Sequence, residues 1–358
     1  MKKTARLAAV AAVAAIALAG CGERPSDENP DASDSPTPTQ TAEPIDFKAC
    51  MVSDSGGFDD KSFNQTSHDG LLAAKANIGV QTAEVESHSD SEYGDNIKAL
   101  VDQGCNSVTT VGFLLGDATL AAAKANKDVD FSIVDYAYFN EKGKNTAPAN
   151  LQGLTFNTDE PSYLAGYLAA ATSETGTVGT LGGMNIPTVT IFMEGFRKGV
   201  EAYNDESGES VKLLGWNGTE GSFTDDFEDK TKGQNIAAQM IGQGADIVFP
   251  VAGPAGLGAL QAAKDADVQA IWVDTDGCVS AAEYCDVLLT SVMKAMDVAV
   301  EASIQGAVDG TFSNEPYVGT LENEGVGLAD IADGVDQEVL DKIDELKADI
   351  ISGAIKLN

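Results

Sequence analysis

Residues 247–273 read IVFPVAGPAGLGALQAAKDADVQAIWV and contain the clearest fold signal in the chain. An apolar run over 247–250 leads into a helical pattern over 256–265, and a second apolar run follows over 270–273. Two short apolar runs separated by a segment of helix length are typical of a parallel βαβ unit. The stretch therefore predicts two parallel strands joined by a crossover helix.

The same alternation continues on both sides of this stretch. Further strands are expected at 48–52, 80–85, 107–111, 131–134, 151–156, 178–181, 211–214 and 287–292. Helical patterns occupy 63–77, 95–103, 117–126, 161–171, 189–204, 234–243, 293–308 and 337–351. Two such series in one chain predict an α/β protein with two doubly wound parallel sheets, one in each of two lobes. Ligands of such sheets bind beyond the carboxyl ends of the strands, so the loops after strands are the candidate site.

The predicted division of the chain crosses between the lobes three times. The first lobe comprises residues 45–157 and 279–316, because the strand and helix over 287–308 are interpreted as one more unit of that lobe. The second lobe comprises 158–278 and 317–358. A hydrophobic content of 43% is ample for two cores.

The first residues have the order of a secretory signal peptide. A basic stretch at 2–6 precedes an apolar run over 7–18 and the sequence LAGC, which ends at Cys21. The apolar run is shorter than the ~20 residues of a membrane-spanning helix. LAGC resembles the bacterial lipobox, which implies removal of residues 1–20, acylation of Cys21 and a stable lipid anchor. Residues 21–44 are polar and Pro-rich, which predicts a disordered tether.

The charge and the missing motifs exclude several classes of protein. A formal net charge of −34 argues against nucleic-acid binding, which needs basic surface, and favours an acidic coat that aids solubility. The sequence contains no GxxxxGK[ST], HExxH or GxSxG motif. Neither enzymatic activity nor a cofactor is expected.

Four cysteines remain once Cys21 is set aside, and three pairings are possible. Cys278 and Cys285 lie close in sequence and predict a local bridge, which leaves Cys50 to pair with Cys105. A zinc site is the alternative, but the chain has no CxxC spacing and only two histidines. No metal is expected.

The loop after the first strand contains DSGGFDDKSFNQ, residues 54–65. Its two glycines permit a tight turn, and Asp60 or Ser62 can cap the helix that follows. Phe63 and Asn64 then project from the first turn of that helix. A phenylalanine at this position can stack on a flat ring, although packing in the core is the alternative.

Four segments together carry a family resemblance: DSGGFDDKSFNQ, GADIVFPVAGPAGLGALQAAK, VDTDG and TSVMKAMDVAV. They resemble the basic membrane protein family of lipoproteins, which includes purine nucleoside receptors of ABC importers, and the match covers nearly the whole folded chain. The resemblance implies a periplasmic-binding-protein type I fold with a hinged cleft. It also implies a nucleoside bound between the lobes, with its base between two aromatic rings.

Matching the family motifs residue by residue assigns the two rings. Phe63 matches the first ring, and Phe223, in the segment GSFTD, matches the second. A short, mostly acidic insertion over 226–229 follows that segment, so Phe227 is a competing candidate for the second ring.

The remaining predicted ligand-binding residues are Asp54, Asn64, Asp135, Gly253, Asp274, Asp276 and Lys294. Asp135 matches the carboxylate that contacts the edge of the base, and the amide of Asn64 offers both a donor and an acceptor. One of Asp274 and Asp276 is expected to accept the ribose hydroxyls, with Lys294 near the sugar. Gly253 lets the backbone approach the ligand.

The sequence thus predicts a monomeric receptor, lipid-anchored on the extracytoplasmic face of the cell membrane, that delivers a nucleoside to the permease subunits of an ABC importer. Three alternatives remain open. A receptor for a sugar or sugar-like autoinducer can use the same cleft. A nucleoside-processing enzyme can hold Ca²⁺ with clustered aspartates, and a surface adhesin can carry a vestigial cleft. The preferred base and the choice between ribose and deoxyribose also stay open.

Overall fold

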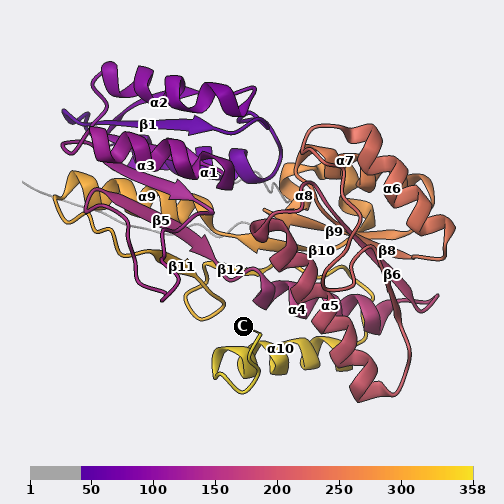
Figure 1. Ribbon diagram of the computed structural model, residues 1–358. Coiled ribbons are helices and arrows are strands. Elements are labelled where there is room, and N and C mark those ends of the chain that lie inside the picture. The colour runs from indigo at the N-terminus through magenta and orange to yellow at the C-terminus, as the bar shows by residue number, and fades with distance from the viewer. Residues whose placement is uncertain (1–41, 358) are drawn as a thin grey trace, which may run out of the picture. The chain divides into compact units, whose positions relative to one another are not determined.

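The computed structural model describes residues 42–357 (Figure 1). The predicted signal peptide and the acylation site Cys21 lie outside the described residues. Within them the strands form two six-stranded sheets, each with helices on both faces. No helix in residues 42–357 combines the length and the apolar character that crossing a membrane requires.

The first sheet is parallel throughout, in the order β11-β5-β4-β3-β1-β2. Its strands are β1 (Lys48–Ser53), β2 (Gln81–Val85), β3 (Ser107–Val111), β4 (Asp130–Val134), β5 (Leu151–Phe156) and β11 (Tyr317–Gly319). One face is covered by α1 (Phe63–Asn77) and α9 (Met296–Val308), the other by α2 (Tyr93–Asp102) and α3 (Gly116–Ala125). Because helices cover both faces of the sheet, all five residues of β3 are buried. This sheet and its four helices are called the first lobe.

The second sheet has the order β12-β10-β9-β8-β6-β7, and only β12 runs antiparallel to its neighbour. Its strands are β6 (Thr177–Gly182), β7 (Lys212–Leu214), β8 (Ile247–Val251), β9 (Gln269–Asp274), β10 (Leu288–Lys294) and β12 (Val326–Leu328). The helices are α4 (Asp159–Thr172) and α5 (Pro187–Ser207) on one face, and α6 (Lys230–Gly242) and α7 (Pro254–Asp265) on the other. The short helix α8 (Gly277–Ser280) follows β9, and α10 (Gln337–Ile351) packs on α4. These elements form the second lobe.

The two doubly wound sheets confirm the predicted α/β class, but the division of the chain differs from the prediction. The expectation that 287–308 is one strand–helix unit of the first lobe is wrong for its strand, since β10 pairs with β9 in the second sheet. Only α9, which follows, lies on the first lobe and packs against α1. Likewise β11 pairs with β5 in the first sheet, although 317–358 was assigned to the second lobe. An apolar strand fits either sheet, so only the pairing decides.

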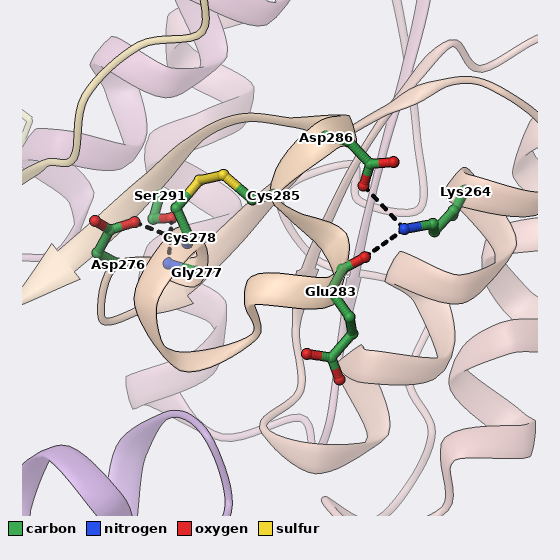
Figure 2. The surroundings of a disulfide bond; sticks show 8 residues. All are labelled: Lys264, Asp276, Gly277, Cys278, Glu283, Cys285, Asp286 and Ser291. Atoms are coloured by element: carbon green, nitrogen blue, oxygen red, sulfur yellow. Dashed lines mark hydrogen bonds and ion pairs between the residues drawn. A yellow bond between two sulfur atoms is a disulfide. The ribbon is translucent and has the colours of Figure 1, made fainter.

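Both predicted disulfides are confirmed. Cys50 on β1 is bonded to Cys105, just before β3, with their α-carbons 6.0 Å apart. Cys278 is bonded to Cys285 across the segment that follows β9, with their α-carbons 4.5 Å apart (Figure 2).

Candidate ligand-binding site

A cleft opens beyond the carboxyl ends of the strands and takes its lining from both lobes. The first lobe contributes the loops after β1, β3 and β4 and the start of α1. The second contributes the start of α5, the loops after β6, β7 and β8, and the last residues of β9 and β10. Seven of the nine predicted ligand-binding residues line it: Asp54, Phe63, Asn64, Asp135, Gly253, Asp274 and Lys294. Phe223 and Asp276 do not.

Phe223 is held away from the cleft by its own backbone. The residues on either side of it exchange hydrogen bonds with Gly182 at the end of β6, from Gly182 N to Ser222 O and from Thr224 N to Gly182 O. This extended pairing turns the Phe223 ring against Trp216, edge to face, with 6.3 Å between ring centroids. Phe223 is therefore not among the residues that line the cleft, because its strand-like pairing directs the side chain into the lobe.

Phe227, the competing candidate, lines the cleft instead. The acidic insertion forms the turn that carries it. Asp226 accepts hydrogen bonds from two backbone amides of that turn and forms an ion pair with Lys232 at 2.6 Å. The carbonyl of Phe227 accepts a hydrogen bond from Ala255 N at the start of α7, 2.8 Å away. The ring lies over Gly183, where a Cβ atom would come within 2.3 Å of it.

Asp54, which is partly buried, and the buried Asn64 form a polar pair in the first-lobe wall. Asn64 Nδ2 donates to Asp54 Oδ1 at 2.7 Å, so the other amide atom, Asn64 Oδ1, is an acceptor. That oxygen is buried without a hydrogen-bond partner in the described residues, and a ligand donor would satisfy it. Burial raises the pKa of Asp54 to about 6, against the lowering effect of the bond from Asn64.

Asp60 was considered only as a cap for the helix, and it also lines the cleft. Its carboxylate accepts the backbone amides of Ser62, Asn64 and Gln65, at 2.8–2.9 Å. These three bonds fix the first turn of α1, which projects Phe63 and Asn64. Burial raises the pKa of Asp60 to about 7, although the three amides favour its charged form. The sequence Asp60-x-Ser-Phe-Asn, with an aspartate just before the first helical turn, indicates that Asp60 can bind the free amides of that turn.

Lys294 is a buried residue of the cleft lining. Its Nζ lies 2.6 Å from Asp135 Oδ2, and the two side chains are only 2% and 9% exposed. The same Nζ lies 4.7 Å from the centroid of the Phe63 ring, 5.2 Å from that of Phe156 and 5.7 Å from that of Phe192. Burial raises the pKa of Asp135, while the charge of Lys294 opposes the shift. Phe192 was not anticipated, because an apolar residue within a helix has the same pattern as a core residue.

Asp274 and Asp276 have different positions. Asp274 lines the cleft, and its Oδ2 accepts a hydrogen bond from Ser62 Oγ at 2.7 Å. Asp276 instead caps α8 by accepting Cys278 N at 2.9 Å, beside the disulfide (Figure 2). The turn that leaves β9 directs the two carboxylates to different places, so Asp276 is not a cleft residue.

The cleft combines aromatic rings from both lobes with four carboxylates and one lysine. Rings on opposite walls suit a flat ligand, and carboxylates accept hydrogen bonds from hydroxyl and amine groups. Within residues 42–357, no group of three or more His, Cys, Asp or Glu side chains is arranged to hold a metal ion. The arrangement is that of a binding site for a small polar molecule with a ring.

Comparison with known proteins agrees with this chemistry. Residues 47–358 match the family described as Bmp, ABC transporter substrate-binding protein PnrA-like. The chain belongs to the Bmp family. It is 33% identical to the ABC transporter nucleoside-binding protein BmpA of Lactococcus lactis, with 97% of each chain covered. It is 32% identical to the CD4+ T-cell-stimulating antigen of Listeria monocytogenes, over 87% of this chain and 88% of that one.

The fold of this Bmp-family protein is shared with solved structures. An ABC transporter solute-binding protein from Aeropyrum pernix superposes with a TM-score of 0.76 at 25% identity, covering 87% of this chain and 92% of the other. The fold is thus the predicted periplasmic-binding-protein type I fold. This Bmp-family protein is a substrate-binding protein of an ABC transporter and not an enzyme. Proteins of this class work outside the cytoplasm, in association with the membrane.

Proposed function

We propose that this protein binds a purine nucleoside in the cleft and delivers it to the permease of an ABC importer. The observation that carries the proposal is the pair of rings on opposite walls, Phe63 from the first lobe and Phe227 from the second. A base is a flat π surface, and stacking on one aromatic side chain contributes ~1–3 kcal/mol. The nucleoside-binding relative from Lactococcus supports the same ligand class.

Polar groups around the rings account for the rest of a nucleoside. Asn64 Oδ1 and the Asp54 carboxylate are acceptors for donors on the edge of the base. Asp274 is the acceptor proposed for the ribose hydroxyls. Lys294, paired with Asp135, lies beside the Phe63 ring and is proposed to donate to the sugar. Gly253, at the start of α7, adopts φ +50° and lets the backbone approach the ligand.

Delivery requires the protein to stay at the membrane surface. The proposed anchor is the acylated Cys21, with the polar segment that follows it acting as a tether. Labelling cells with a palmitate analogue tests this part: the wild-type protein should incorporate label, and Cys21→Ala should not. Label on the Cys21→Ala protein would overturn the anchor.

Mass spectrometry of the purified protein, followed by calorimetry, tests the ligand. We expect a purine nucleoside to co-purify and guanosine, inosine or adenosine to bind, whereas free ribose should bind at least ~100-fold more weakly because it lacks the base that stacks. Phe223→Ala is the matched control for Phe227→Ala, since only Phe227 faces the cleft. Binding of ribose without nucleoside affinity would make the protein a sugar receptor, and release of free base from inosine would make it an enzyme.

A further inference from the structure

Two hydrogen bonds join the lobes directly at one corner of the cleft. Ser62 Oγ, at the start of α1, donates to Asp274 Oδ2 on β9 at 2.7 Å and lies 3.3 Å from Val273 O. Trp272 Nε1, also on β9, donates to Lys61 O at 3.3 Å. Ser62 and Trp272 are 0% exposed and Asp274 is 7% exposed. Hydrogen bonds in such a dry environment stabilise the contact more than exposed bonds do.

Ser62 has the position of a helix cap but does not act as one. Serine at this position normally accepts a backbone amide of the first turn. In α1 the Ser62 side chain makes no capping bond, and the Asp60 carboxylate accepts the free amides instead. The Ser62 hydroxyl is therefore available to donate across the cleft.

The backbone around these bonds is held in unusual conformations. Lys61 has φ +63° and Asp274 has φ +72°, a region that costs non-glycine residues about 1–2 kcal/mol. The turn at Lys61 presents its carbonyl to Trp272, and the turn at Asp274 presents its carboxylate to Ser62. Both strained residues thus take part in the contact between the lobes.

We propose that Ser62 is a positioning residue, which orients the Asp274 carboxylate for the ligand and, together with the Trp272–Lys61 bond, latches the lobes closed. Ser62 engages Oδ2 of Asp274, so Oδ1 is the oxygen that meets the ligand. Both bonds of the latch join protein groups, so the latch stabilises the closed state even when no ligand is bound. The orientation of Asp274 matters only to ligand binding, and that part rests on the proposed function.

Fluorescence of Trp272 reports the latch without any ligand. The chain contains two tryptophans, and Trp216→Phe leaves Trp272 as the sole indole. In that background, Ser62→Ala should shift the ligand-free emission of Trp272 to longer wavelength, because an opened corner admits water to the indole. Ser67→Ala is the matched control: Ser67 is an equally buried serine on α1, and its hydroxyl bonds to Phe63 O within the first lobe.

Small-angle scattering and calorimetry complete the test. Ligand-free Ser62→Ala and Trp272→Phe should have a larger radius of gyration than Ser67→Ala, and Ser62→Ala should bind guanosine about tenfold more weakly, as loss of one such hydrogen bond predicts. If Ser62→Ala does not fold, the radius of gyration of Trp272→Phe tests the latch instead.

Emission and radius of gyration equal to those of Ser67→Ala would overturn the latch. An open latch with unchanged guanosine affinity would overturn the positioning role, and wild-type protein that binds no nucleoside would refute the proposed function but not the latch.

Discussion

The two walls of the cleft differ in their chemistry. The first lobe presents the buried polar groups of Asp60, Asn64 and Asp135 and the partly buried Asp54, together with the ring of Phe63. The second lobe presents mainly apolar surface from α5, the β8–α7 loop and Phe227, with Asp274 and Lys294 at its strand ends. Directional hydrogen bonds select the atoms of a ligand, whereas apolar surface selects its shape. The comparison predicts that most polar contacts to a ligand come from the first lobe, while the second lobe mainly covers it.

The largest expected effect comes from the ion pair of Lys294 with Asp135, which joins the two walls. Lys294→Met should lower the free energy of unfolding by about 3–5 kcal/mol, because it leaves a buried carboxylate without its partner. Urea denaturation measures this loss. Lys294→Met combined with Asp135→Asn should recover part of it. Lys98→Met, which breaks the exposed pair with Asp102, should cost less than ~1 kcal/mol. Equal losses in the two single variants would contradict the buried-pair argument.

Each wall contributes one proposed stacking ring, Phe63 in the first lobe and Phe227 in the second, so substitutions of these rings compare the two walls directly. Phe63→Ala and Phe227→Ala should each weaken nucleoside binding by ~1–3 kcal/mol in calorimetry, since each removes one stacking partner. Phe223→Ala should destabilise its lobe, whose Trp216 it contacts, with a smaller effect on affinity. A larger loss of affinity in Phe223→Ala than in Phe227→Ala would reverse the assignment of the second ring.

The disulfides provide a comparison of stability between the lobes. Cys50–Cys105 spans 55 residues and Cys278–Cys285 spans seven. In the chain-entropy account, paired Cys→Ser variants at the first bridge should lose roughly 1–2 kcal/mol more than those at the second, because the closed loop is longer. Thermal unfolding measures the difference.

The second bridge lies beside Asp276 and close to Asp274, so its loss should mainly loosen ligand binding. A larger stability loss at the second bridge would argue against this account.

The last prediction concerns the pH dependence of stability and the polar wall of the first lobe. Because burial raises the pKa of Asp54 from 3.8 to about 6, the folded protein binds more protons than the unfolded chain between these values. The contribution of Asp54 to stability is therefore present below about pH 4 and is lost as the pH rises to about 6. Asp54→Asn, which keeps an acceptor for Asn64, should flatten the decline in stability over this range. An unchanged slope in urea titrations between pH 4 and 6 would contradict the shift.

The two rings illustrate how far sequence reasoning reaches. Phe63 follows a strand, a glycine turn and a helix cap, and this local order places it in the wall of the cleft. Phe223 and Phe227 share one loop, and no local pattern separates them. The choice depends on Phe223 pairing with β6 and on Phe227 bonding to the start of α7, both contacts between segments distant in the chain.

The alternation of strands and helices, the two disulfides and seven of the residues that line the cleft could be predicted from the sequence. The elements follow from hydrophobic periodicity, the disulfides from cysteine spacing, and the location of the site from the rule that loops after parallel strands meet at one edge. The individual cleft residues follow mainly from the resemblance to the family motifs. Only the tertiary structure decided that β10 lies in the second sheet, that Asp274 rather than Asp276 faces the cleft, and that the Ser62 hydroxyl crosses between lobes. Each of these depends on which partner a strand, a carboxylate or a hydroxyl meets across a long stretch of chain, and such partners leave no local pattern.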